Sequence, residues 1–125
     1  MVNNSSKKKV GKKGEEIALS FLRKRGYNIL DRNFRCRLGE LDIVAEENNQ
    51  IVFIEVKTRE NLNFGLPQES LDYLKKKRLT RLALFYLASR HLKNISCRFD
   101  VVAVFLKKGR VENIHLIKNA FEATF

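Results

Sequence analysis

The chain has 125 residues, which is enough for one domain with a buried core. Lysine and arginine number 25 against 14 aspartate and glutamate residues, so the formal charge is +11. This surplus predicts an anionic partner, and nucleic acid is favoured over a membrane because no stretch is long or apolar enough to span a bilayer. The polar start of the sequence lacks a signal-like apolar region, and we expect a cytoplasmic protein.

Residues 1–9 are charged and rich in serine and asparagine, which predicts a flexible basic arm before a single domain over residues 10–125. A helix is predicted over about residues 10–25, ended by Gly26 as its C-cap. Glu15 lies at the border of the apolar stripe of this helix, where a charge is costly unless it meets a partner. It is either an acid favoured near a helix N-terminus or, if the helix begins earlier, a residue with a directed role.

A first strand is predicted over residues 27–37, followed by a β-hairpin over residues 39–57. Asn48 and Asn49 stand between two apolar runs, and asparagine tolerates the positive φ that a tight turn needs. The second run, IVFIEV, is apolar on both sides, which predicts a central strand covered on both faces. Alternation of side chains assigns one apolar face of the hairpin to Leu41, Ile43, Ala45, Val52, Ile54 and Val56.

The register of this turn places acids together. Asp42 is predicted to lie opposite Glu55, and Glu40 opposite Lys57, with all four side chains on one face. Carboxylates directly opposite one another repel and lose hydration, so a compensating charge is needed. Mg²⁺ bound by Asp42 and Glu55 would supply it, with Lys57 at the edge of the site. The alternative is an ion pair between Glu40 and Lys57, with the other two acids solvated at a sheet edge.

A long helix is predicted from Glu69 or Ser70 to about Lys93, with an apolar side formed by Leu71, Leu74, Leu82 and Phe85 beside Leu79, Ala83, Tyr86 and Leu87. The interval TRENLNFGLPQ before it is predicted to be a loop over the mouth of the site, whose Phe64 anchors it to the core or stacks on a base. Cations beside a carboxylate site suit phosphate binding, although a solvated basic face is the alternative. The candidate phosphate-binding residues are Arg35, Arg37, Arg59, Lys75, Lys76, Lys77 and Arg78.

The remaining sequence predicts two more strands. CRFDVVAVFL and VENIHLI are strand-like, KKGR is a turn between them, and residues 119–125 form a short tail that docks through Phe121. The chain is therefore predicted to have an α/β fold with a sheet of about five strands that contains the hairpin. Cys36 and Cys97 lack metal-ligand spacing and are expected to be reduced thiols.

An acid on a first helix, an aspartate in a strand and E-x-K in the next strand resemble the PD-(D/E)xK nuclease superfamily. The segments GKKGEEIALSFLRKRGYNILDRNFR, GELDIV, VFIEVKTR, FGLP and RFDVVAV, with a lysine-bearing helix ending in ALFYLA, resemble the YraN-like family of uncharacterised bacterial proteins over residues 11–121. That family is grouped with archaeal Holliday junction resolvases. The resemblance implies a restriction-endonuclease-like fold of three layers, with helices flanking a mixed central sheet.

The resemblance also implies roles for individual residues. Glu15, Asp42, Glu55 and Lys57 would be catalytic, with Asp42 and Glu55 as ligands of Mg²⁺ or Mn²⁺. Leu41 precedes Asp42 where the superfamily pattern has proline, which leaves the carboxylate in place. Secondary candidates that also match the family pattern are Glu40, Lys75 and Asp100.

The expected function is that of a metal-dependent endonuclease that binds and cleaves DNA, including branched or structured DNA, by Mg²⁺-assisted phosphodiester hydrolysis. DNA is favoured over RNA as the partner, and an RNA nuclease is a third hypothesis. The alternative is a non-catalytic, nucleic-acid-binding accessory protein that keeps the nuclease scaffold. Because resolving a branched DNA needs two active sites, a homodimer is expected by analogy.

Overall fold

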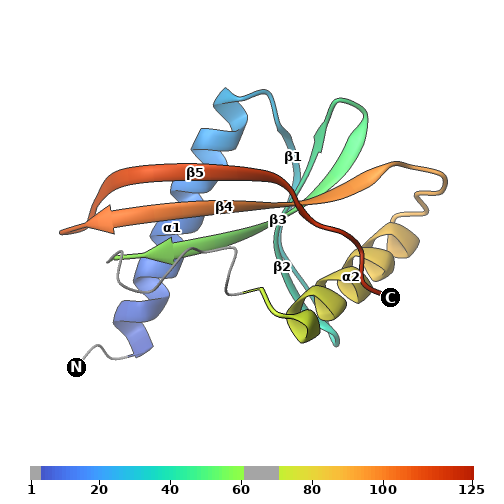
Figure 1. The fold of residues 1–125 in the computed structure, drawn as a ribbon, viewed down its shortest axis with the longest axis horizontal. Coiled ribbons are helices and arrows are strands. Elements are labelled where there is room, and N and C mark those ends of the chain that lie inside the picture. The colour runs from blue at the N-terminus through green and yellow to red at the C-terminus, as the bar shows by residue number, and fades with distance from the viewer. Residues whose placement is uncertain (1–3, 61–70) are drawn as a thin grey trace.

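The computed structural model of the chain describes residues 4–60 and 71–125, with side chains from Lys9 onward (Figure 1). Its elements are α1 (Asn4–Lys24), β1 (Asn28–Cys36), β2 (Gly39–Glu47), β3 (Gln50–Arg59), α2 (Tyr73–Ser89), β4 (Cys97–Lys107) and β5 (Arg110–Phe121). The strands form one sheet in the order β1-β2-β3-β4-β5, in which only the β3–β4 pair is parallel because α2 connects those two strands. The predicted hairpin, β2 and β3, lies inside the sheet.

The core consists of two apolar layers separated by the sheet. The layer against α1 includes Ala18, Leu19, Leu22, Ile43, Ala45, Val52, Ile54, Val102 and Val104. The layer against α2 includes Leu41, Val44, Ile51, Phe53, Leu79, Leu82, Tyr86, Phe99 and Phe121. Because side chains alternate along a strand, β3 supplies both layers, as its predicted central position requires. The α/β, three-layer restriction-endonuclease-like fold that the sequence predicts is confirmed.

The helix boundaries differ from the predicted ones. Helix α1 begins at Asn4, six residues before the predicted start, so residues 4–9 belong to the helix and not to an arm. Helix α2 begins at Tyr73, because the Asp72 carboxylate accepts the backbone N–H of Lys75 at 2.8 Å as an N-cap. It ends at Ser89, before the predicted Lys93. The predicted loop around Phe64 lies outside the described residues.

Both helices end in the same way. Gly26 after α1 and His91 after α2 adopt positive φ values of 88° and 55°. The N–H groups of the residues that follow, Tyr27 and Leu92, donate to carbonyl oxygens of Leu22 and Leu87 at 3.0 and 2.9 Å. This is the Schellman arrangement, in which a left-handed residue satisfies carbonyls that the helix leaves free. The predicted C-cap at Gly26 is confirmed.

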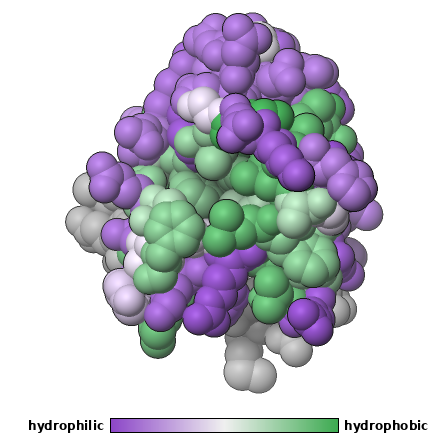
Figure 2. All heavy atoms as spheres, turned by 90° about the vertical axis from the view of Figure 1, so that its right-hand side faces the viewer, coloured by the Kyte–Doolittle hydropathy of each residue, from purple (hydrophilic) through white to green (hydrophobic). Residues whose placement is uncertain are grey.

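The buried side of α2 is rotated from the predicted stripe. Leu74 is 70% exposed and Phe85 is 36% exposed. Figure 2, which faces the side of the molecule that carries α2, shows apolar side chains at the surface. The residues of α2 that are buried are Leu79, Thr80, Leu82, Ala83 and Tyr86. Tyr86 donates its hydroxyl to Asp31 of β1 at 2.7 Å, and its ring meets Phe53 edge-on at 5.9 Å. These two contacts fix the rotation of the helix about its axis.

Strand β5 extends further than predicted. It continues to Phe121, whose ring stacks on Phe99 at a centroid distance of 4.6 Å, so the predicted docking of Phe121 is confirmed. The turn before β5 contains Lys108 and Gly109 at φ values of 51° and 76°. Among the elements that the structure describes, neither helix has a stretch long and apolar enough to cross a membrane.

Gly14 marks a close approach of α1 to β3, which leads to a prediction about stability. A Cβ atom at Gly14 would lie 1.8 Å from Oγ1 of Thr58, whereas a Cβ atom at Gly11 would have no neighbour within 4 Å. We expect Gly14→Ala to cost about 1–3 kcal/mol through overpacking, offset in part by roughly 1 kcal/mol of helix propensity. Gly11→Ala is the matched control and should stabilise the protein. Denaturant unfolding measures both, and equal stabilisation would contradict the close packing.

Candidate functional site

The site lies where β2 and β3 separate, a place that we call the strand fork. The turn at Asn48 and Asn49, with φ values of 50° and 63°, sets the predicted register, which is confirmed from Glu47 opposite Gln50 to Ile43 opposite Ile54. Beyond this point β2 follows β1 while β3 follows β4 (Figure 1).

The ladder therefore leaves the backbone N–H of Val56 without a carbonyl acceptor on β2. Oδ2 of Asp42 accepts this N–H at 2.9 Å. A buried donor needs such a partner, so the carboxylate of Asp42 is held inside the fork.

The alternation of side chains in β2 breaks at Asp42. Leu41 packs in the layer against α2, whereas Ile43 packs against α1, so the predicted placement of Leu41 on the same face as Ile43 is wrong. On the neighbouring strand β1, Asn33 has a positive φ of 54°. This local kink reorients both strands, and the four charged hairpin residues do not share the single face that a regular strand would give them.

Three carboxylates meet at the fork, and we call Glu15, Glu40 and Asp42 the acidic cluster. One oxygen of each lies within 4.8 Å of the other two, although the residues come from α1 and β2. The amide nitrogen of Asn33 donates to Glu40 at 2.9 Å and to Glu15 at 3.0 Å in the orientation that satisfies both acids. Because α1 begins at Asn4, Glu15 is about three turns from its N-terminus, and the helix dipole no longer explains its position.

Neither the contribution of Gly14 nor that of Asn33 was predicted from the sequence. Gly14 lets α1 approach Thr58, which brings the adjacent Glu15 to the sheet. Asn33 lies inside the predicted first strand, and the tolerance of asparagine for positive φ is the signal that could have marked it.

The acids of the fork perturb one another. Burial raises the pKa of Asp42 to about 8, and the nearby charges of Glu55, Glu15 and Glu40 add to the increase against the effect of the Val56 hydrogen bond. Burial and the charge of Glu40 likewise raise the pKa of Glu15. Asp42 and Glu15 both favour the protonated form more than a free carboxyl group does, because they are buried and lie near other negative charges.

Glu55 lies on the α2 side of the fork and is buried. Its Oε1 is 3.1 Å from Nζ of Lys75 on α2 and 3.6 Å from Nζ of Lys57. Burial lowers the pKa of Lys57; Glu55 opposes this shift, while the positive charge of Lys75 adds to it. The structure thus brings the predicted acid and lysine of the E-x-K motif together, and it adds the secondary candidate Lys75 to them.

Glu40 does not lie opposite Lys57, because the β2–β3 ladder has ended before that point. It pairs instead with Arg35 of β1, directly across the β1–β2 ladder, at 3.4 Å. The predicted placement of Glu40 against Lys57 is wrong, and so is the alternative ion pair between them.

The predicted phosphate-binding cations divide into two groups. Lys75 and Arg35 contact acids of the site, as described above. The others form no ion pair with any acid that the structure describes, and they are Arg37, Arg59, Lys76, Lys77 and Arg78. Of these, Arg59 donates to the carbonyl of Thr58 at 3.1 Å, at the end of β3 that carries Lys57.

Asp100 belongs to a different network. It is fully buried and accepts the hydroxyl of Tyr27 at 2.9 Å, Nε of Arg98 at 3.0 Å and the backbone N–H of Asn119 at 2.9 Å. Arg98 also binds Glu47 at 2.7 Å. The secondary candidate Asp100 therefore joins β4, β5 and the segment after α1, and none of the hydrogen bonds of its side chain among the described residues goes to the acidic cluster.

The donor set of the acidic cluster fits a hard divalent cation. Mg²⁺ binds oxygen ligands at about 2.0–2.1 Å, so two ligands on opposite sides of one ion are roughly 4.2 Å apart. The separations within the cluster, all at most 4.8 Å, are close to this value. The ligand atoms that lie closest together are thus those of Asp42, Glu15 and Glu40, whereas Glu55 is already contacted by two lysines.

The raised pKa of Asp42 predicts how stability depends on pH without divalent cations. Its ordinary pKa is about 3.9, so between about pH 4 and pH 8 the folded state holds a proton that the unfolded state has lost. The free energy of unfolding should therefore fall across this range, by at most about 1.4 kcal/mol per pH unit for one proton.

Asp42→Asn can still accept the Val56 N–H but cannot titrate. Relative to the wild type, this variant should gain stability as the pH rises from 5 to 8, as measured by urea unfolding in EDTA. Parallel pH profiles for the two proteins would show that Asp42 ionises as a normal surface acid.

Comparison with known proteins identifies the family. Residues 14–104 match the profile described as "Uncharacterised protein family UPF0102". A UPF0102 protein of Moorella thermoacetica is 53% identical over 117 residues, which cover 93% of this chain and 98% of the relative. A UPF0102 protein of Caldicellulosiruptor saccharolyticus is 51% identical, with 93% and 99% covered. The predicted resemblance is confirmed, and the chain belongs to the uncharacterised protein family UPF0102.

Proposed function

We propose that this protein is a metal-dependent endonuclease that acts on DNA, with branched or structured DNA as its preferred substrate. The observation that carries the proposal is the acidic cluster, in which partly buried carboxylates from two elements converge within 4.8 Å and the pKa of Asp42 is raised. The formal charge of +11 supports a polyanionic substrate. A group of acids inside a strongly basic chain suits a site where the acids bind a cation and the surrounding basic residues bind a phosphate.

Asp42, Glu15 and Glu40 would hold Mg²⁺ or Mn²⁺, with Glu55 at the border of the site. When bound, such an ion lowers the pKa of a coordinated water and stabilises negative charge on phosphoryl oxygens. Asn33 keeps the carboxylates of Glu15 and Glu40 oriented.

Lys57 would contribute a positive charge beside the scissile phosphate. Its ammonium group is held 3.6 Å from Glu55, in a partly buried position where an electrostatic contact is stronger than in water. Burial lowers its pKa, which brings the ammonium closer to the range in which it can exchange a proton with a water molecule. Lys75, on the other side of Glu55, would bind a neighbouring phosphate oxygen or keep Glu55 in place.

Cation binding tests the ligand assignment separately from catalysis. We expect Mn²⁺ titrated into the wild type to bind at one site, with affinity that is at least tenfold weaker in Asp42→Asn and in Glu40→Gln. Glu46→Gln is the matched control, because Glu46 is an exposed acid on the same strand. Glu55→Gln should weaken binding less than Glu40→Gln does, since Glu55 is paired with lysines. Electron paramagnetic resonance of free Mn²⁺ measures all four variants, and the reverse order would favour Asp42 and Glu55 as the direct ligands.

Cleavage assays test the reaction. We expect Mg²⁺-dependent product bands from branched, nicked or single-stranded DNA. The cleavage rate should fall roughly 100-fold or more in Asp42→Asn and in Lys57→Met, in line with the loss of a positioned catalytic group. Glu46→Gln should cleave like the wild type. Parallel RNA substrates test the choice of nucleic acid. DNA binding without any cleavage by the wild type would refute the enzyme and support an accessory protein that only binds nucleic acid.

A further inference from the structure

The turn between β4 and β5 carries a second group of cations, none of which is among the predicted phosphate-binding residues. Lys107, Lys108 and Arg110 surround this turn, and we call them the basic tip. Lys13 of α1 donates to the carbonyl oxygen of Gly109 in the same turn, so the helix holds the tip in place. The tip borders an open hollow of about 440 Å³, which Val111 and Glu112 also line.

The charges of the basic tip oppose its own folding. Lys107 and Arg110 are direct partners across the β4–β5 ladder, and like charges in this arrangement destabilise a hairpin. None of the three cations forms an ion pair with an acid among the described residues, Glu112 included. A tip selected for stability alone would place opposite charges here. An anionic ligand would remove the repulsion.

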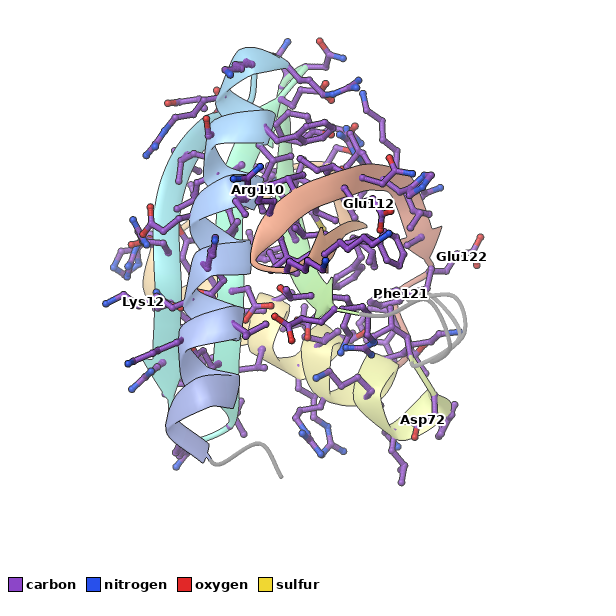
Figure 3. The ribbon with its side chains drawn as sticks, turned by 90° about the vertical axis from the view of Figure 1, so that its left-hand side faces the viewer. Lys12, Asp72, Arg110, Glu112, Phe121 and Glu122 are labelled. Carbon is purple, nitrogen blue, oxygen red and sulfur yellow. The ribbon has the colours of Figure 1, made fainter. Side chains whose placement is uncertain are left out.

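The basic tip lies in line with the proposed active site. Lys57 on β3 is the register partner of Ala103 on β4, and Lys107 follows four residues later. At about 3.3 Å per residue, the tip is roughly 13 Å beyond Lys57. Figure 3 shows Arg110 beside α1, on the other side of the end of β3 from Asp72, which caps α2. The basic tip and the start of α2 therefore lie on opposite sides of the end of β3.

We propose that the basic tip, together with Lys13, binds the phosphate backbone of a DNA duplex about four base pairs away from the phosphate that Lys57 would contact. This number follows from the 13 Å offset and the rise of about 3.4 Å per base pair. A row of cations that continues away from the site suits a linear polyanion. The inference rests on the proposed function, because the tip would bind the part of the same DNA substrate that lies beside the cleavage site.

The test removes three charges from the tip and three from elsewhere. The tip variant is Lys107→Gln with Lys108→Asn and Arg110→Gln, in which asparagine preserves the positive φ of the turn. The control variant is Arg23→Gln with Lys24→Gln and Lys93→Gln, three exposed positions near the C-terminal ends of the two helices. Fluorescence anisotropy with a 30-base-pair duplex is measured in EDTA at several salt concentrations, so that cleavage has no effect on the result.

The tip variant should bind the duplex roughly tenfold more weakly than the control variant. The slope of the logarithm of its binding constant against the logarithm of the salt concentration should be smaller in magnitude by about two to three. Its melting temperature should equal or exceed that of the wild type, because the repulsion between Lys107 and Arg110 is gone. This second readout excludes misfolding as the cause of weaker binding.

Equal affinities of the tip and control variants would overturn the inference. It would also be overturned if the tip variant lost binding to phosphatidylserine vesicles but kept its affinity for the duplex, since the tip would then serve a membrane surface. If the wild type cleaves no DNA and the tip variant still binds more weakly than the control, the proposed hydrolysis fails while the placement of the duplex stands.

Discussion

The end of the β2–β3 ladder after Ile43 and Ile54 is the constraint on which the site depends. Where the strands separate, the backbone N–H of Val56 needs a new acceptor, and the side chain of Asp42 supplies it. A carboxylate committed to that bond cannot turn to solvent, so it stays partly buried among other acids. The separation also makes room for Glu15, which α1 can bring in because Gly14 packs directly on Thr58.

Two aspartates of the sheet show how the same side chain acquires different properties. Asp100 is fully buried but has Arg98, Tyr27 and a backbone N–H as partners, so its charge is balanced where it lies. Asp42 has one backbone donor and three acids nearby, and its pKa rises to about 8. The first arrangement is structural: a buried carboxylate that is paired and hydrogen-bonded can stay charged, and its bonds connect neighbouring strands. The second leaves a local excess of negative charge, which is the property that a cation site requires.

The parallel pairing of β3 and β4 organises the positive charge around the fork. It requires a crossover helix, and the first turn of that helix carries Lys75 to Glu55. The same pairing makes β4 continue beyond the end of β3, so that Lys107 and Arg110 extend past the site in the direction of the strand. Basic groups on both sides of an acidic centre are thus a consequence of the sheet topology, and they are compatible with one extended anionic ligand.

The sequence by itself determined the fold class, the hairpin turn, the central position of β3 and the E-x-K pair, because these depend on local propensity and on alternation along a strand. It also marked Glu15 as an acid at the border of an apolar stripe, and it left open whether the helix N-terminus or a directed role explains that position. The sequence did not reveal that the strands separate after Ile43, that Leu41 changes sides or that Glu40 joins Glu15 and Asp42. Only the tertiary structure decided these points, because a kink at Asn33 and the packing of α1 against β3 arise between elements that are distant in the sequence. The prediction that Glu40 lies opposite Lys57 assumed that β2 and β3 stay paired beyond Ile43 and Ile54, but in the folded chain their pairing ends there.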